Sequence, residues 1–166
     1  QGIILSLIES EIQMKRPIGL SHLLEITFIA PKLIQLGETP YGKRVIANID
    51  GGHFEGPNLK GTVQGPGGDW LLIRQDNSVQ MDVRVSLLTD DNEIIFLSYQ
   101  GIRVGEQEVL NRLQAGEKVN PTEYYMRTLC RFETGSKKYA WLNSILAAGT
   151  GERYPDYVMY DIYKIA

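Results

Sequence analysis

The amino-acid sequence predicts an all-β fold, a closed antiparallel β-barrel preceded by a short N-terminal helix. Three observations lead to this prediction. Segments rich in strand-forming residues follow one another along most of the chain, clear turn signals separate them, and little helix intervenes. A β-sandwich would give the same pattern, and the barrel is preferred because closure leaves no sheet edge open to aggregation.

The first segment, residues 2–14, is predicted to be a helix. Its apolar residues follow helical spacing, and Pro17 should end the element near Lys15. A strand over residues 3–7 is the alternative. An apolar stripe of this size needs cover from the barrel or from a second subunit, so we expect a homo-oligomer, a dimer. The stripe consists of Ile3, Ile4, Leu7, Ile8 and Ile12.

The predicted strands follow in order, with a loop expected at 33–40 and a short helix at 106–113. The glycine-rich stretch 45–74 is expected to hold two or three strands joined by tight turns at one mouth of the barrel. Turn signals such as Asp90-Asp91-Asn92 mark the strand ends. The predicted strands are 22–30, 43–49, 59–64, 70–76, 79–89, 93–102, 124–132, 140–149 and 157–165.

Length and composition bound the class of protein. The 166 residues, 43% of them hydrophobic, suit one domain, with an extension at 1–17 and a barrel at 22–165. A formal net charge of −3 without a basic run argues against nucleic acid as a partner. No run of about 18 apolar residues occurs, so no membrane span is predicted. Cys130 is the only cysteine, which excludes an internal disulfide.

The chain begins at Gln1 rather than at a methionine, which indicates processing or cropping. A cytoplasmic location is favoured. Secretion stays open if a targeting segment once preceded Gln1.

The strand at 79–89 alternates between an apolar and a polar face. In one orientation the polar face meets water. In the other, Asp82 and Arg84 line the barrel interior, where Tyr125 and Arg127, also two residues apart on one strand, would join them. We predict that these four side chains converge on one cavity.

Asp69 follows two glycines and precedes Trp70, at the entrance of a predicted strand. A carboxyl group beside an indole is a candidate for desolvation and a raised pKa, which suits acid–base chemistry. Its alternative role is to accept hydrogen bonds from backbone N–H groups of the turn.

Aromatic side chains offer contacts for a small molecule. Tyr139 and Trp141 lie two residues apart, and a pocket of such residues suits an aromatic or polyketide-like ligand, although they could equally fill a core. His53 lies in G-G-H-F-E and is either a site residue or a solvated turn residue. With His22 it makes too few histidines for a zinc site, and no phosphate-binding loop or G-x-S-x-G motif occurs.

Several ordered motifs resemble one family. They are N-I-D-G-G-H-F-E-G-P-N-L-K-G, G-G-D-W, D-V-R-V-S-L-L-T-D-D, Y-Q-G-I-R, Y-M-R-T-L-C-R-F-E-T-G and Y-A-W-L-N. They identify residues 24–164 as similar to the DUF3237, or UPF0311, family of domains of unknown function. The resemblance implies a closed barrel with an interior cavity, often in an oligomer, and no settled activity. Asn92 and Cys130 depart from the family pattern, which has glycine and proline there. The family-like residues include Asp69, Trp70, Asp82, Arg84, Arg103, Tyr125, Arg127, Tyr139 and Trp141.

The function favoured at this point is a cofactor-independent cyclase or isomerase acting on a mostly apolar small molecule, such as a polyketide- or terpenoid-like metabolite. Proximity inside a cavity and general acid–base catalysis would supply the rate. A non-catalytic carrier and a hydrolase such as a lactonase are the alternatives. The expected catalytic residues are Asp69, Asp82, Arg84, Tyr125 and Arg127. The expected substrate contacts are His53, Trp70, Tyr99, Tyr139 and Trp141, and no metal ligand or cofactor is expected.

Overall fold

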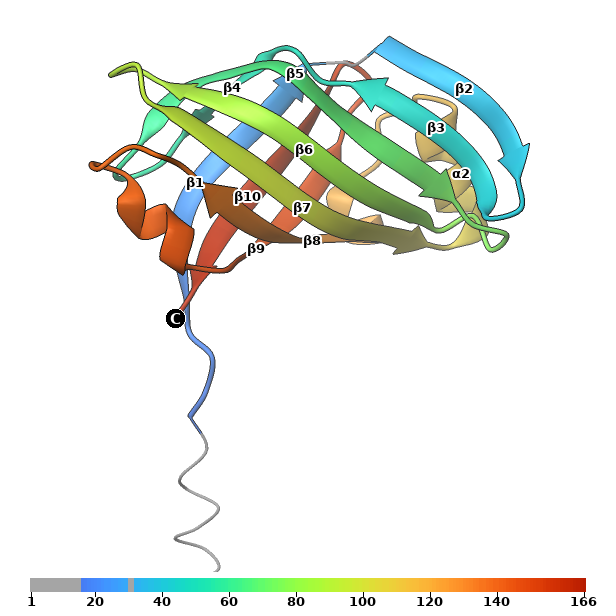
Figure 1. Cartoon of the computed structure of the whole chain (residues 1–166). Helices are drawn as coiled ribbons and strands as arrows, with labels where there is room; N and C mark the ends of the chain where they lie inside the picture. Colours follow the sequence, from blue (N-terminus) through green and yellow to red (C-terminus); the bar gives the residue numbers. More distant parts are fainter. Residues whose placement is uncertain (1–15, 30–31) are drawn as a thin grey trace, which may run out of the picture.

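The computed structural model describes residues 16–29 and 32–166 (Figure 1). The helix expected at residues 2–14, with its stripe of isoleucines and leucine, lies outside the described residues. The strands are β1 (Leu20–Ile29), β2 (Lys32–Thr39), β3 (Gly42–Asn48), β4 (Gly52–Glu55), β5 (Lys60–Ile73), β6 (Val79–Thr89), β7 (Ile94–Gly105), β8 (Tyr124–Glu133), β9 (Ala147–Arg153) and β10 (Tyr157–Ile165). One α-helix, α2 (Gln107–Gln114), follows β7, and 3-10 turns occupy Pro121–Glu123 and Ala140–Ser144.

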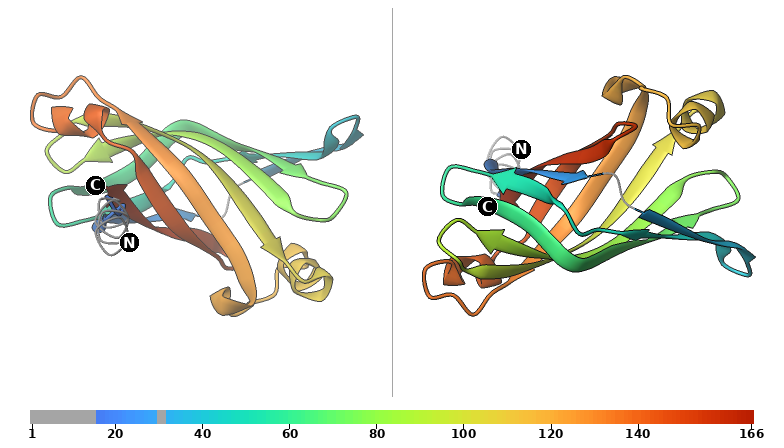
Figure 2. Two further views of the ribbon diagram at one scale, coloured as in Figure 1. Left: turned by 90° about the horizontal axis from the view of Figure 1, so that it is seen from below. Right: turned by 90° about the horizontal axis from the view of Figure 1, so that it is seen from above.

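Eight antiparallel strands close into a barrel, as predicted. Their order is β5-β4-β1-β10-β9-β8-β7-β6, and pairing between β5 and β6 completes the ring. Strands β3 and β2 continue the sheet from the second half of β5, outside the ring. Figure 2 shows this β2–β3 hairpin projecting from one end of the barrel.

Strand β5 is one long strand, where two strands, 59–64 and 70–76, were predicted. The chain runs through Gly-Pro-Gly-Gly without reversing, and the register with β6 shifts between Gln64 and Gly67. Such an irregularity bends a strand without ending it. The first half of β5 therefore pairs with β4 and the second half with β3. A Cβ at residue 67 would lie 2.8 Å from the Ile49 carbonyl oxygen, so only glycine fits at this bend.

Two other predicted elements differ. Residues 33–39 of the stretch expected as a loop belong to strand β2, where a register shift beside Gly37 absorbs the left-handed φ of 82°. The strand expected at 140–149 is a 3-10 turn followed by β9, which starts later at Ala147. Helix α2 covers 107–114, one residue later at each end than the predicted 106–113.

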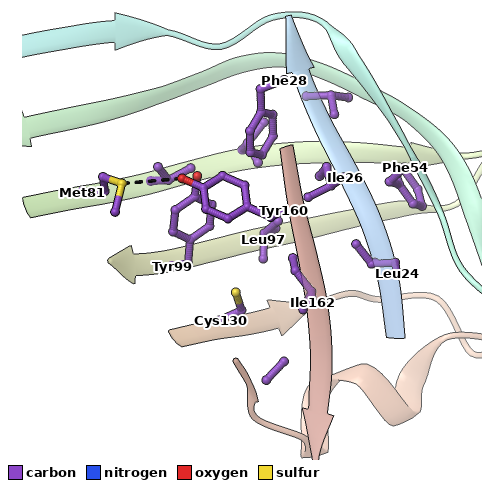
Figure 3. Close-up of a cluster of buried hydrophobic side chains, with 14 of the residues drawn as sticks. Leu24, Ile26, Phe28, Phe54, Met81, Leu97, Tyr99, Cys130, Tyr160 and Ile162 are labelled. Atoms are coloured by element: carbon purple, nitrogen blue, oxygen red, sulfur yellow. Dashed lines mark hydrogen bonds between the residues drawn. The ribbon is translucent and has the colours of Figure 1, made fainter. Parts of the chain in front are cut away.

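The apolar face of each barrel strand points inward. Along β6 the buried residues are Val79, Met81, Val83, Val85 and Leu87, and the intervening residues are half-buried or exposed. One end of the barrel is filled by close-packed side chains, and Figure 3 shows Leu24, Ile26, Phe54, Leu97 and Ile162 among them. Helix α2 packs Leu110 and Leu113 into the same continuous core.

Candidate functional site

The other end of the barrel holds a cavity of about 360 Å³. Its mouth lies between the β2–β3 hairpin, which supplies Leu33 and Lys43, and the β9–β10 turn, which supplies Tyr154 and Tyr157. Gln114, at the end of α2, joins the rim. The volume falls within the usual range of small-molecule sites.

Three aromatic rings form the inner wall of the cavity. Tyr99 and Tyr160 lie 5.2 Å apart between ring centroids, and Phe28 lies 6.4 Å and 6.1 Å from them (Figure 3). Gly151 provides the space for the Tyr160 ring, because a Cβ at residue 151 would lie 2.6 Å from that ring. The Tyr160 hydroxyl donates to the Met81 sulfur at 3.5 Å, a weak acceptor.

Asp69 contributes the carboxyl group of this wall. It lies on β5 and is 8% exposed. Its Oδ1 accepts a hydrogen bond of 3.0 Å from the backbone N–H of Asp82. This contact falls where the recorded β5–β6 pairing has a gap, between Asp69–Val83 and Leu72–Gln80. No other hydrogen bond to Asp69 occurs among the described residues, which leaves Oδ2 for a ligand.

Burial raises the pKa of Asp69 from 3.8 to about 7. The Asp82 N–H bond opposes this rise, the negative charge of Asp82 adds to it, and the positive charge of Arg103 opposes it more weakly. A carboxyl group with this pKa exchanges protons readily near neutral pH. Burial also raises the pKa of Tyr99 and of Tyr160, so both hydroxyls remain hydrogen-bond donors.

Two arginines share the cavity. Arg103, on β7, is 8% exposed, and burial lowers its pKa to about 10, with repulsion from Arg153 as the next cause. Arg153, on β9, donates through Nη1 to the Leu113 carbonyl of α2, and burial lowers its pKa too. Sequence reasoning did not propose either residue as part of a site.

Two predicted catalytic residues, Asp82 and Arg84, lie on the outer wall of the barrel, so the expected convergence on the cavity was wrong. Their side chains are 39% and 57% exposed and form a loose ion pair at 3.7 Å. Trp70 lies beside them, with the Arg84 guanidinium 5.4 Å from its ring centroid. The physical reason is the inward turn of the apolar face of β6, which places its polar face outside.

The other predicted pair, Tyr125 and Arg127, also lies outside. Both side chains are exposed on β8, and the Arg127 guanidinium covers the Tyr125 ring at 4.9 Å. The inner face of β8 carries Tyr124, Met126 and Thr128 instead. His53 on β4 is exposed as well and does not line the cavity.

Tyr139 and Trp141 lie at the 3-10 turn after β8, away from the cavity lining. The Tyr139 hydroxyl donates to Asp91 at 2.9 Å, and Lys138 and Thr89 bind the same carboxylate. These contacts join the β6–β7 turn to the turn at 139–144 and serve structure. Of the residues predicted to be catalytic or to contact the substrate, only Asp69 and Tyr99 line the cavity.

The family resemblance that the sequence motifs indicated is confirmed by a match to the sequence model of that family. The family model "Protein of unknown function (DUF3237)" matches residues 19–165. The chain belongs to the DUF3237 family. A UPF0311 protein of Rhodopseudomonas palustris is 33% identical over 144 residues, which cover 87% of this chain and 94% of the relative.

Solved structures with similar folds support the barrel. A conserved protein of unknown function from Rhodopseudomonas palustris has a TM-score of 0.88 at 32% identity, covering 92% of this chain and 100% of its own. A β-barrel-like protein of Acinetobacter baumannii has a TM-score of 0.79 at 37% identity, covering 92% and 98%. A protein of Penicillium herquei described as an enzyme shares the fold, with a TM-score of 0.67 at 21% identity, covering 92% and 97%.

The described residues lack two features of other protein classes. They contain no helix that is both long and apolar enough to cross a membrane. Residues 16–29 and 32–166 also hold no cluster of three histidine, cysteine or acidic side chains placed to bind a metal ion.

Proposed function

We propose that this DUF3237 protein is an isomerase or cyclase that moves a proton on a mostly apolar small molecule held in the barrel cavity. The observation that carries the proposal is the buried Asp69 carboxyl, whose pKa is raised to about 7 in the cavity wall. Active sites are where burial is used to shift pKa values toward neutrality. The Penicillium herquei protein described as an enzyme has the same fold, which is compatible with catalysis in such a barrel.

The proposed reaction uses Asp69 as both base and acid. In an isomerisation, its carboxylate takes a proton from the carbon beside a carbonyl group, and the electron pair moves onto the carbonyl oxygen as an enolate. Where a carbon–carbon double bond adjoins that carbon, the enolate is a dienolate, and the same proton returns to the far carbon of the double bond. The double bond moves into conjugation with the carbonyl group, and no other reactant is consumed. In a cyclisation, the attacking atom loses its proton to Asp69 as it bonds to a carbonyl carbon of the same molecule. The π electron pair of that carbonyl moves onto its oxygen, which then takes the proton back from Asp69.

The tyrosines suit the developing negative charge. Tyr99 and Tyr160 keep their protons because their pKa values are raised, and the Tyr160 hydroxyl has only the Met81 sulfur as its hydrogen-bond acceptor in the structure described. Donation to an enolate oxygen would replace a weak bond by a strong one. This replaces the earlier assignment of that role to Arg84, Tyr125 and Arg127.

Deuterium exchange tests the proposal without knowledge of the natural substrate. The ketone 2-tetralone has acidic protons beside its carbonyl group, and NMR in D₂O follows their replacement. We expect the protein to accelerate this exchange and Asp69→Asn to lower the rate by about a hundredfold or more, the usual contribution of general acid–base catalysis.

Asp82→Asn is the matched control, because it removes a nearby carboxylate outside the cavity. Its negative charge helps to raise the Asp69 pKa, so its removal should move the midpoint of the pH–rate profile downward and retain exchange. If wild-type protein and Asp69→Asn exchange 2-tetralone equally, Asp69 is not the base. If the ketone binds without any exchange, the protein is better described as a carrier.

A further inference from the structure

The buried guanidinium of Arg103 is the feature that the proposed proton transfer leaves unexplained. Arg103 lines the cavity and follows Tyr99 and Gly101 on the inward face of β7. Its Nε is completely buried without a hydrogen-bond partner. Within residues 16–29 and 32–166 no carboxylate forms an ion pair with it and no side-chain hydrogen bond from it is found.

Such an arrangement is unfavourable for the protein alone. A buried cation needs a paired charge or hydrogen-bond acceptors to offset its lost hydration. Nε is the only nitrogen of this guanidinium that is both fully buried and unpaired, so the Nη atoms keep contact with the cavity. A planar guanidinium with free Nη donors matches a carboxylate group.

The charges around the cavity point the same way. The charged lining residues are the cations Lys43, Arg103 and Arg153 and a single carboxyl, Asp69. The chain as a whole has a net charge of −3, so the cavity is opposite in sign to the molecule. Arg153 is held by the Leu113 carbonyl, and its positive charge acts on Arg103.

The rest of the lining is apolar and aromatic. Phe28, Val45, Ile49, Met81 and Met126 surround the space, together with the two tyrosines. A ligand that matches both the cationic residues and the apolar lining has an apolar body and one anionic end.

We propose that the cavity binds an apolar carboxylic acid, with its carboxylate on Arg103 beside Arg153 and its body against the aromatic wall. This names the substrate class of the proposed isomerase or cyclase and rests on that function only for the fate of the ligand. Arg103 is the anchoring residue, and Asp69 faces the reactive part of the same molecule.

A matched pair of probes tests the anchor by binding alone. 2-Naphthoate carries a carboxylate, and 2-naphthalenemethanol has nearly the same shape without charge. Titration calorimetry at pH 7.5 should show naphthoate binding about tenfold tighter or more, since hydrogen bonds to charged groups exceed neutral ones. Equal affinity of the two probes for wild-type protein, or no binding of either, would overturn the proposal.

Variants assign the preference to Arg103. Arg103→Met should abolish the preference for naphthoate and leave the alcohol bound, whereas Arg84→Met, the same change on the outer wall, should alter neither. Arg103→Lys keeps the charge without the fork and should retain part of the preference, which provides a test if the methionine variant does not fold. The assignment is contradicted if both variants keep the full preference for naphthoate over the alcohol. It is also contradicted if Arg103→Met does not fold and Arg103→Lys keeps the full preference.

Asp69→Asn separates this inference from the proposed reaction. It should keep or strengthen naphthoate binding, because it removes a negative charge near the anion, while proton exchange is lost. Loss of naphthoate binding in Asp69→Asn would contradict the assignment of the anion to Arg103. Intact binding with no exchange in any protein would remove the proposed reaction and leave the binding site standing.

Discussion

Asp69 combines two features that the sequence presented as alternatives. Its Oδ1 accepts the Asp82 N–H at a gap in the strand pairing, which is a structural contact, and its burial raises its pKa, which is a chemical one. The two are compatible because a carboxyl group has two oxygens. The structural bond fixes the orientation of the group, and Oδ2 remains for chemistry.

The raised pKa of Asp69 should be visible in the stability of the protein. The folded state keeps a proton up to about pH 7 that the unfolded chain releases near pH 3.8, so the folded state binds more protons between these values. The stabilisation from this group is therefore complete below pH 3.8 and lost as the pH rises through 7. The full loss corresponds to roughly 4 kcal/mol as an upper limit.

Asp69→Asn should remove this pH dependence, because an amide does not ionise and still accepts the Asp82 N–H. We expect urea unfolding to show the variant gaining stability over wild type as the pH rises from 5 to 8. Asp156→Asn, in the exposed β9–β10 turn, is the control and should behave as wild type. A constant difference between Asp69→Asn and wild type across this range would mean that Asp69 is ionised throughout.

Gly151 should be intolerant of any side chain. A Cβ there would lie 2.6 Å from the Tyr160 ring and 2.8 Å from Met126 Cγ, so Gly151→Ala forces these groups apart. We expect a loss of about 1–3 kcal/mol in the free energy of unfolding, the usual cost of overpacking. Gly135→Ala meets nothing within 4 Å and is the control. Equal melting temperatures for both variants would show that the cavity wall yields easily.

Sequence alternation defines two faces of a strand but not which one points inward. For β6 either orientation was consistent with the sequence, and the wrong one was preferred for Asp82 and Arg84. The sequence did contain an indication that Arg103 points inward, which was not used. Arg103 falls on the same face of β7 as Ile95, Leu97 and Tyr99, because strand side chains alternate every second residue. A single cation among inward apolar positions predicts a buried charge, and buried charges mark sites.

At the scale of elements, the β2–β3 hairpin lines the mouth of the cavity and is not a separate appendage. Leu33 of β2 lines the mouth, whereas Leu36 of the same strand does not. Leu33→Ser should therefore weaken 2-naphthoate binding several-fold, because it removes apolar contact with the ligand.

Leu36→Ser is a close control, since the two side chains are 47% and 52% exposed. It should bind as tightly as wild type in the same titration. Equal effects of the two substitutions would show that the hairpin does not touch the ligand.

The sequence predicted β6 and β10 at their observed bounds but misread β5 and β2. Both errors came from glycine and proline, which usually mark turns. In β5 they produce a register shift within a continuous strand, because partner strands β4, β3 and β6 hold the chain extended on both sides. Such tertiary pairing is not visible in local sequence.

At the scale of the whole molecule, barrel closure was predictable and a homodimer stays a prediction. The stripe at residues 3–12 lies outside the described residues. The outer faces of β7 and β8 expose Ile102, Val104 and Leu129, which are suitable for a second copy. We expect light scattering after size exclusion to give the mass of a dimer, and Leu129→Arg to give that of a monomer.

Leu36→Arg, an equally drastic change on β2, should leave the mass unaltered. A monomer for wild-type protein at every concentration would remove the dimer. A dimer that survives Leu129→Arg would place the contact elsewhere.

The division of the barrel into a packed end and a hollow end has an evolutionary consequence. Leu33, Lys43 and Tyr154 stand on hairpins at the rim of the hollow end, outside the cluster of buried hydrophobic side chains. Single substitutions at the rim can therefore alter ligand preference with little risk to folding. If the cavity binds a ligand as we propose, substitutions at the rim are where we expect relatives such as the Rhodopseudomonas palustris protein, at 33% identity, to differ in ligand preference. Rim residues are the better guide for grouping them.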